Sequence, residues 1–261
     1  MSLPVIETVD FGGPDGAPLL MLAPSLGTSV TALWAGAAAL LTEQHCVVGF
    51  DLPGHGHSPA PAAPFTISDL AQAVHHAATS RGTRSYHYAG LSVGGAVGLE
   101  LLLHHGQAVT TAALICTGAK IGTHTAWMER ARTVRARGTA IMLEPAATAW
   151  FADGFTGRDP DTAEALLQSL ADADTDGYAG TCEALAGFDV RDQLAAITAD
   201  VLAVAGTDDL ATPPSSLQYL ARRIASCRYV ELAATAHLAA PAEQPTRIAA
   251  ELISSVRRSH S

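Results

Sequence analysis

The sequence has few charged residues, few aromatic residues and a single lysine. Charged side chains make up 15% of the 261 residues and aromatic side chains 5%, whereas hydrophobic residues make up 48%. A chain of this composition can bury a sizeable core, which excludes a disordered protein. Its 261 residues are enough for one large α/β domain with a small inserted cap. The formal net charge of −10 argues against a nucleic-acid partner, because a phosphate backbone requires a basic face.

Long hydrophobic runs and paired cysteines are also missing. Prolines, glycines and charges interrupt each apolar stretch before it reaches the length of a membrane span, and the first residues lack the features of a signal peptide. We therefore expect a cytoplasmic protein with no membrane partner. The four cysteines show no CxxC spacing, which indicates neither a zinc site nor disulfides. Cys46 and Cys116 lie in apolar runs and are expected to be buried thiols.

Short apolar runs alternate with helical patterns along most of the chain. The expected strands are an antiparallel edge strand within 5–11 and parallel strands at 19–23, 47–51, 86–89, 112–116, 201–205 and 229–232. Enough chain for a helix separates each run from the next, which is the βαβ signature of a parallel sheet. The alternation stops after residue 117 and returns near 198. We predict a doubly wound, mostly parallel α/β core, residues 1–117 and 198–261, with residues 118–197 as a helical cap.

A serine bracketed by glycines lies between a predicted strand and a predicted helix. It is Ser92, in the pentapeptide Gly90-Leu91-Ser92-Val93-Gly94. A sharp turn from strand to helix strains the backbone of its corner residue, and glycines on either side let the two elements pass closely. Such a turn presents the hydroxyl at the edge of the sheet, beside the positive end of a helix. Ser92 is a candidate nucleophile, although G-x-S-x-G also occurs by chance in ordinary glycine-rich turns.

The partners that a nucleophilic serine needs follow later strands. A base must take the serine proton and a third group must orient that base, and a doubly wound sheet gathers such groups in the loops after its strands. The run at 201–205 leads to Asp208 and Asp209, and the run at 229–232 leads to His237. Both aspartates are open as the acid. The order Ser, Asp, His is that of the α/β hydrolases.

An attacked carbonyl also needs two backbone N–H groups to hold its developing negative charge. Val93, directly after the serine, is expected to supply one of them. The loop after residues 19–23 is expected to supply the other, from Leu26, because Pro24 has no N–H. His55 and His57, in the loop after 47–51, lack accompanying carboxylates or thiolates at metal-site spacing, which favours a structural role. We expect no metal and no cofactor.

With these residues in place, the chain resembles the α/β-hydrolase superfamily over nearly its whole length, and within it the 3-oxoadipate enol-lactonases. The segments similar to that family are 25–28, 51–58, 119–123, 127–130, 134–138, 150–151, 176–185, 211–214 and 243–245. The resemblance implies an α/β-hydrolase fold with Ser92 as nucleophile and His237 as base. It also selects Asp209 over Asp208 as the acid, because the family's aspartate follows the glycine by three residues.

The activity implied by this resemblance is hydrolysis of a small enol-lactone that carries a carboxylate. In the β-ketoadipate pathway of aromatic catabolism, 3-oxoadipate enol-lactone would be opened to 3-oxoadipate through an acyl-enzyme. Two alternatives share the fold. A carboxylesterase or a lactonase of another pathway would have the same triad and a different cap, and a non-catalytic binding protein would bind a ligand without turnover.

An acidic chain that takes a small anionic lactone needs a local cation. A basic cluster lies between Lys120 and Arg137. We expect Arg130 and Lys120 to bind the carboxylate and Trp127 and Trp150 to wall the pocket, since a guanidinium can grip a carboxylate through two hydrogen bonds. The alternative is that the arginines of this segment form a solvated helix face, and they cannot all point inward. The sequence leaves a homo-oligomer open.

Overall fold

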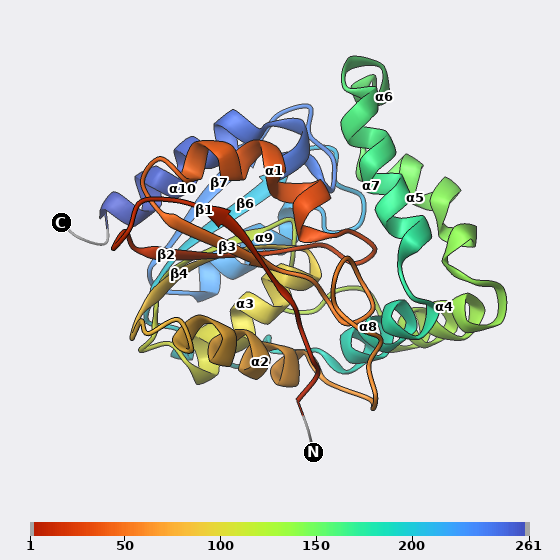
Figure 1. The fold of residues 1–261 in the computed structure, drawn as a ribbon, viewed down its shortest axis with the longest axis horizontal. Helices are drawn as coiled ribbons and strands as arrows, with labels where there is room; N and C mark the ends of the chain where they lie inside the picture. The colour runs from red at the N-terminus through yellow and green to blue at the C-terminus, as the bar shows by residue number, and fades with distance from the viewer. Residues whose placement is uncertain (1–2, 259–261) are drawn as a thin grey trace.

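A seven-stranded sheet runs through the molecule in the order β1-β3-β2-β4-β5-β6-β7 (Figure 1). The structure is a computed structural model that describes residues 3–258, without the side chains of residues 239, 240 and 258. The strands are β1 (Thr8–Gly12), β2 (Leu19–Ala23), β3 (Cys46–Phe50), β4 (Tyr86–Leu91), β5 (Val109–Ile115), β6 (Asp200–Gly206) and β7 (Cys227–Leu232). β1 pairs with β3 in antiparallel fashion and the other pairs are parallel. The predicted strands are confirmed, each within three residues of the expected bounds.

Helices cover both faces of the sheet. α1 (Val30–Leu41) and α10 (Pro245–Arg258) pack together on one face, and α2 (Ile67–Thr79) and α3 (Val93–His104) pack together on the other (Figure 1). α9 (Pro214–Arg223) contacts β6 and β7. A strand with helices on both sides is buried along its whole length, as β2 and β4 are. This double cover is why these strands appear in the sequence as unbroken apolar runs rather than alternating ones.

Between β5 and β6 the chain leaves the sheet and forms a group of helices at one side of the molecule (Figure 1). We call this group the cap. It comprises α4 (His124–Arg137), η1 (Thr139–Met142), α5 (Leu143–Trp150), α6 (Phe155–Arg158), α7 (Pro160–Asp172) and α8 (Thr175–Gly187), followed by η2 (Leu194–Ala196). Side chains of Thr123, Asp159 and Asp174 accept backbone hydrogen bonds at the starts of α4, α7 and α8. These caps satisfy N–H groups that each helix would otherwise leave unpaired.

The prediction for the cysteines is correct for one residue and wrong for another. Cys116 is buried, whereas Cys46 is only half-buried. Cys46 begins β3 and lines a depression formed with the loop after β1 and the residue before β4, which leaves its side chain partly accessible. In the described part of the chain, no helix is both long enough and apolar enough to cross a membrane. The same residues contain no group of three or more histidine, cysteine or acidic side chains that could hold a metal ion.

Gly90 lies where β4 passes under the start of α3. A Cβ atom at this position would come 2.3 Å from the carbonyl oxygen of Gly94, and backbone cannot yield as a flexible side chain would. We expect Gly90→Ala to lower the free energy of unfolding by about 3 kcal/mol, because the strand and helix must separate to admit one methyl group. Equilibrium unfolding in urea measures this loss.

Gly157 in α6 provides the matched control for Gly90. It has no atom within 4 Å of an added Cβ. Gly157→Ala is therefore expected to leave the stability unchanged or to raise it by up to about 1 kcal/mol, through the higher helix propensity of alanine. Equal stability of the two variants would show that a methyl group fits between β4 and α3 without separating them.

Candidate active site

The turn from β4 into α3 holds Ser92 in a strained conformation. Its φ is 57° and its ψ is −114°, in a region that residues with side chains rarely adopt. The Ser92 hydroxyl makes no capping hydrogen bond to α3. The backbone of Ser92 is fixed instead, because Thr117 Oγ1 donates to its carbonyl oxygen at 2.7 Å and its N–H donates to Ile115. The turn therefore leaves the hydroxyl facing a pocket, which Ser92 lines.

Asp209 and His237 form a buried pair at the ends of the next strands. Asp209 follows β6 and His237 follows β7, and His237 Nδ1 donates to Asp209 Oδ2 at 2.9 Å. This bond leaves Nε2 as the proton-accepting nitrogen of the neutral ring. Two backbone N–H groups, of Ala211 and Thr212, donate to Asp209 Oδ1, and the Thr212 hydroxyl donates to Oδ2.

These contacts keep the Asp209 carboxylate charged inside the protein. Burial by itself raises the pKa of Asp209, but the neighbouring His237 and the hydrogen bonds from His237 and Thr212 outweigh it, so the pKa lies below its ordinary value. A buried charge with four hydrogen-bond donors is a fixed anchor for the His237 ring.

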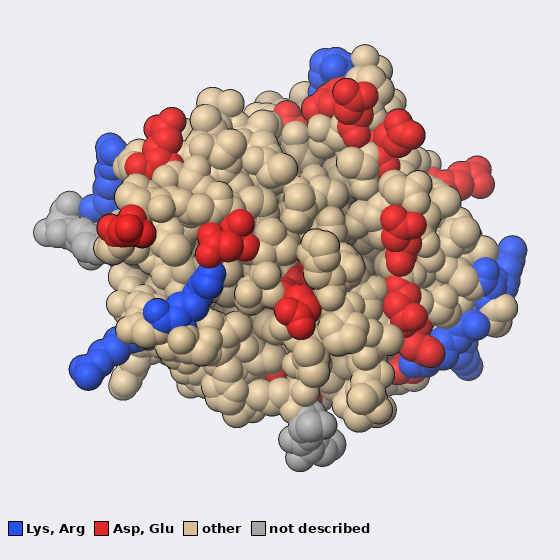
Figure 2. Space-filling view, in the orientation of Figure 1, with Lys and Arg blue, Asp and Glu red and all other residues tan. Residues whose placement is uncertain are grey.

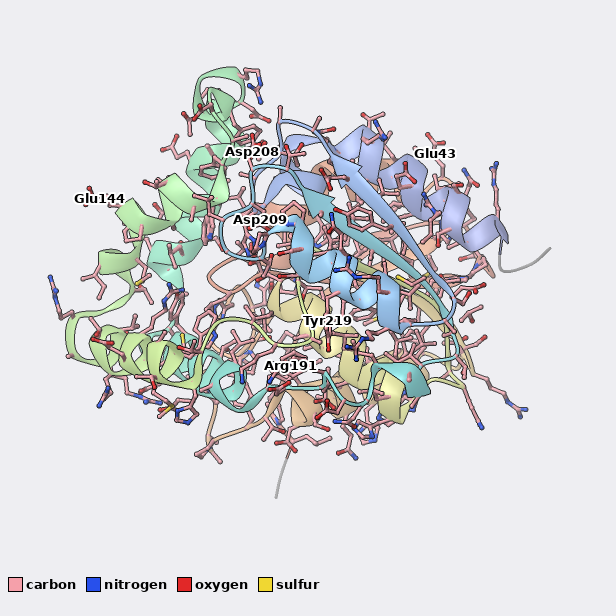
Figure 3. All side chains as sticks on the ribbon, turned by 180° about the vertical axis from the view of Figure 1, so that it is seen from behind. Glu43, Glu144, Arg191, Asp208, Asp209 and Tyr219 are labelled. Atoms are coloured by element: carbon pink, nitrogen blue, oxygen red, sulfur yellow. The ribbon has the colours of Figure 1, made fainter. Side chains whose placement is uncertain are left out.

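The two candidate acids lie in different surroundings. Asp208 is exposed and accepts a hydrogen bond from Thr207 Oγ1 at 2.9 Å. Seen from behind, Asp208 lies nearer the edge of the molecule and Asp209 lies further in (Figure 3). Of the pair, Asp209 is the residue that contacts His237, as the family resemblance implies.

Ser92 and His237 line one cavity of about 250 Å³ between the carboxyl ends of the strands and the cap. The contacts of the described residues include no hydrogen bond between the Ser92 hydroxyl and His237. Such bonds are often long in proteins without substrate and tighten in the reacting complex. The cavity thus brings a free hydroxyl and a carboxylate-anchored imidazole to the same space, which is the equipment for nucleophilic attack on an acyl group.

Leu26 and Val93 supply two backbone N–H groups beside Ser92. The loop of Leu26 is folded on itself, since Thr28 Oγ1 bonds both the N–H and the carbonyl oxygen of Ser25. Among the described residues, the N–H groups of Leu26 and Val93 donate no hydrogen bond. Leu26 lines the cavity and Val93 begins α3. Both donors are therefore available to an oxygen atom of a ligand.

The cap forms the opposite wall of the cavity. The lining residues that come from the cap and from the loop before α4 are Ile121, Gly122, Ala126, Trp127, Arg130, Met142, Pro145, Ala146, Ala149, Trp150 and Tyr178. Of the four cap residues expected to bind substrate, Trp127, Arg130 and Trp150 line the cavity. The wall is mostly apolar, so a charged group on it is a specific feature.

Arg130 is that charged group. Its guanidinium lies 4.9 Å from the centre of the Trp127 ring, and it forms no ion pair with a carboxylate in residues 3–258. Arg135, on the same helix, is exposed and pairs with Glu183 and Asp176. In the region of α4 and α8, at the right edge of Figure 2, basic and acidic side chains lie next to each other. Arg135 therefore belongs to a solvated helix face, whereas Arg130 lines the cavity.

Lys120 does not reach the cavity, and its expected role in binding the substrate is wrong. Its ammonium group donates to Asp189 Oδ2 at 3.0 Å on the surface. Arg191 and Lys120 together hold the pKa of Asp189 well below its usual range, so the charge of Lys120 already has a partner. Asp189 lies 69 positions along the chain from Lys120, and no local pattern of the sequence links the two residues.

Three residues of the site were given no role from the sequence. Thr212 orients Asp209, and Ser25 and Tyr178 line the cavity. Thr212 could have been found, because a threonine three residues after an aspartate is a common local hydrogen-bonding pattern. Tyr178 could not, since several residues of α8 are equally compatible with a buried face. Burial raises the pKa of Tyr178, and the adjacent Arg130 partly opposes that shift.

The chain is similar in sequence to known proteins. A family model described as alpha/beta hydrolase fold matches residues 18–241. The chain is 35% identical over 218 residues to 3-oxoadipate enol-lactonase 2 of Acinetobacter baylyi, covering 82% of this chain and 79% of that protein. It is 32% identical over 240 residues to 3-oxoadipate enol-lactonase 1 of the same organism, covering 92% and 89%.

A solved structure extends the similarity to three dimensions. The crystal structure of the enol-lactonase from Burkholderia xenovorans superposes with a TM-score of 0.92 at 31% sequence identity. The match covers 97% of this chain and 96% of that chain, so it includes the cap as well as the sheet.

Proposed function

Because the chain belongs to the α/β-hydrolase family and is an enol-lactonase-type hydrolase, we propose that it opens a small enol-lactone that carries a carboxylate. The proposed substrate is 3-oxoadipate enol-lactone and the product 3-oxoadipate, an intermediate of aromatic catabolism. The observation that carries this proposal is Arg130, a cation on an apolar pocket wall with no carboxylate partner among the described residues.

The chemistry would use Ser92 as nucleophile. His237 Nε2 takes the hydroxyl proton while Asp209 stabilises the resulting imidazolium, and Ser92 Oγ attacks the lactone carbonyl. The N–H groups of Leu26 and Val93 hold the oxyanion, each worth about 3 kcal/mol of transition-state stabilisation. The ring C–O bond then breaks, and the leaving enolate oxygen takes the proton from His237.

The second half of the cycle releases the product. The enol remains part of the acyl chain on Ser92, because the broken ester was cyclic, and it tautomerises to the ketone. His237 next takes a proton from water, whose oxygen attacks the acyl carbon, and Ser92 leaves with that proton. The roles of proton acceptor and donor alternate on one nitrogen, which the bond from Nδ1 to Asp209 keeps available.

Arg130 would provide recognition. An acidic protein repels an anionic ligand at long range, so a cation inside the pocket is needed to bind one. A guanidinium presents parallel N–H groups that match the two oxygens of a carboxylate. Trp127 beneath the guanidinium restricts its movement and Trp150 forms a further wall.

Arg130→Ala is expected to raise KM for the carboxylated enol-lactone about 10- to 100-fold, the range for losing a charge-assisted hydrogen bond. KM for the neutral ester p-nitrophenyl acetate should change less than twofold, because that substrate has no carboxylate. Steady-state kinetics with both substrates measure the split.

Arg135→Ala is the matched control, since Arg135 lies on the same helix and faces the surface. It should leave both KM values near those of the unmodified protein. If Arg130→Ala raised KM by the same factor for both substrates, Arg130 would not be the residue that binds the carboxylate. Turnover of p-nitrophenyl acetate without turnover of the enol-lactone would favour a carboxylesterase or a lactonase of another pathway.

A further inference from the structure

The segment that carries Trp150 is held by the chain that follows His237. Leu238 N–H donates to the carbonyl oxygen of Trp150 at 3.0 Å. Two residues further along the cap, Ala152 N–H donates to Glu243 Oε1 at 2.8 Å. Leu238 directly follows His237, and Glu243 ends the turn η3 (Ala239–Glu243) after it. The peptide groups on both sides of Phe151 are thus bonded to the same stretch of the core.

Glu243 makes its bond from an unfavourable position. Its Oε2 atom is buried and has no hydrogen-bond partner in the described structure, and burial raises the pKa of Glu243. A carboxyl group that is buried with one oxygen unbonded costs stability. The bond from Ala152 to Oε1 joins the core to the cap. This bond, the Ala236 backbone and the charge of Arg158 partly oppose the effect of burial on the Glu243 pKa.

Trp150, whose carbonyl oxygen is bonded to Leu238, also contacts the opposite side of the cavity. Its ring lies against Gly27, where an added Cβ atom would come within 3.4 Å of Trp150 Cζ2 and Cη2. Gly27 follows Leu26, one of the two proposed oxyanion donors. Trp150 therefore touches the Leu26 loop with its ring while its backbone is bonded to the His237 loop. Both loops and the ring line the same cavity.

We propose that Glu243 is a positioning residue for the reaction. By accepting from Ala152 N–H, it fixes Trp150 against the Leu26 loop, so that this wall of the cavity keeps a constant position relative to His237. Glu243 itself touches no substrate. The inference rests on the proposed hydrolase chemistry at Ser92, but it does not depend on which ester or lactone is the substrate.

The test is a double-mutant cycle between Glu243 and Trp150, measured as kcat/KM on p-nitrophenyl acetate and on the enol-lactone. Glu243→Ala is expected to lower kcat/KM about 10-fold, since small displacements in an active site are costly. Glu243→Gln keeps an acceptor for Ala152 N–H and should stay within twofold of the unmodified protein. In the Trp150→Ala background, Glu243→Ala should change kcat/KM less than twofold, because the group it positions is gone.

Glu251→Ala supplies the control. Glu251 lies on α10 and is also partly buried, and it pairs with Arg228 of β7 and with Arg247 of α10. None of these three residues lines the cavity. It should leave kcat/KM unchanged in both backgrounds. If Glu243→Ala does not fold, Glu243→Met takes its place, because methionine keeps the side-chain length and lacks the acceptor.

Two results would overturn the positioning role. One is an equal loss from Glu243→Ala with and without Trp150. The other is a Glu243→Gln variant as impaired as Glu243→Ala. If the enol-lactone is not a substrate, the proposed function fails but the positioning role can still be tested, because the cycle can be measured on p-nitrophenyl acetate alone. If neither substrate turns over, the rate at which a fluorophosphonate labels the protein replaces kcat/KM in the same cycle.

Discussion

Ser92→Ala is expected to lower kcat about 10⁵- to 10⁶-fold and to abolish labelling by a fluorophosphonate. The size of the effect follows from the arrangement of the site. Among residues 3–258, Ser92 is the one hydroxyl residue with a positive φ, so the Asp209–His237 pair has no second hydroxyl of this kind to activate. Without a nucleophile, the donors Leu26 and Val93 can contribute only a small residual rate. Rates on the enol-lactone and on p-nitrophenyl acetate should fall together, because both need the same attack.

Ser25→Ala is the control for this loss, because Ser25 is a second buried serine that lines the same cavity. It should still be labelled by the fluorophosphonate. Labelling of Ser92→Ala would mean that another residue is the nucleophile. A protein that binds the lactone but neither hydrolyses it nor is labelled would be a binding protein built on a hydrolase fold.

The elements that the sequence predicts best are those whose local pattern has one physical solution. A five-residue apolar run between prolines is too short for a buried helix, and the predicted strand at 19–23 coincides with β2. The glycines around Ser92 indicated a turn too tight for side chains, and a Cβ on Gly94 would indeed lie 2.7 Å from Ala23 Cβ. In both cases the constraint comes from neighbours that the sequence itself identifies.

The cap was harder to predict because its contacts are set by residues far apart in the chain. Lys120 and Arg130 are both cations in the same basic segment of the sequence, which does not show which of them faces the pocket. Asp189, which lies 69 positions from Lys120, decides that Lys120 faces the surface. The bond between Ala152 and Glu243 spans 91 positions. The spacing of apolar residues along the chain does not predict these two pairings, because each of the four residues is also compatible with a solvated loop.

The choice between Asp208 and Asp209 lies between these extremes. The two side chains are chemically identical and adjacent, so composition and secondary structure do not separate them. The separation comes from the turn after β6, in which Ala211 and Thr212 close around the second aspartate. One residue of displacement along this turn decides whether a carboxylate is exposed or bonded to His237. Substitution of each aspartate in turn therefore tests the acid directly.

Asp209→Asn is expected to lower kcat about 10⁴-fold, the order of effect seen when the acid of a Ser-His-Asp triad is neutralised. An asparagine amide in this place can donate to His237 Nδ1, and the ring then carries its proton on Nε2, where it cannot accept the proton of Ser92. The charge that would stabilise the imidazolium is lost as well. Fluorophosphonate labelling should slow by a similar factor, because it depends on the same proton transfer.

Asp208→Asn is a closely matched control, with the same substitution one residue earlier on an exposed side chain. It should change kcat less than twofold. Melting temperatures of both variants show whether a loss of activity reflects a loss of the fold, and the Asp209 variant should still be folded at 25 °C when its kcat is measured. An Asp209→Asn variant with more than a tenth of the original kcat would mean that the buried carboxylate orients nothing essential. A large loss in Asp208→Asn would instead assign the acid to the exposed neighbour, against the 2.9 Å bond from His237 Nδ1 to Asp209.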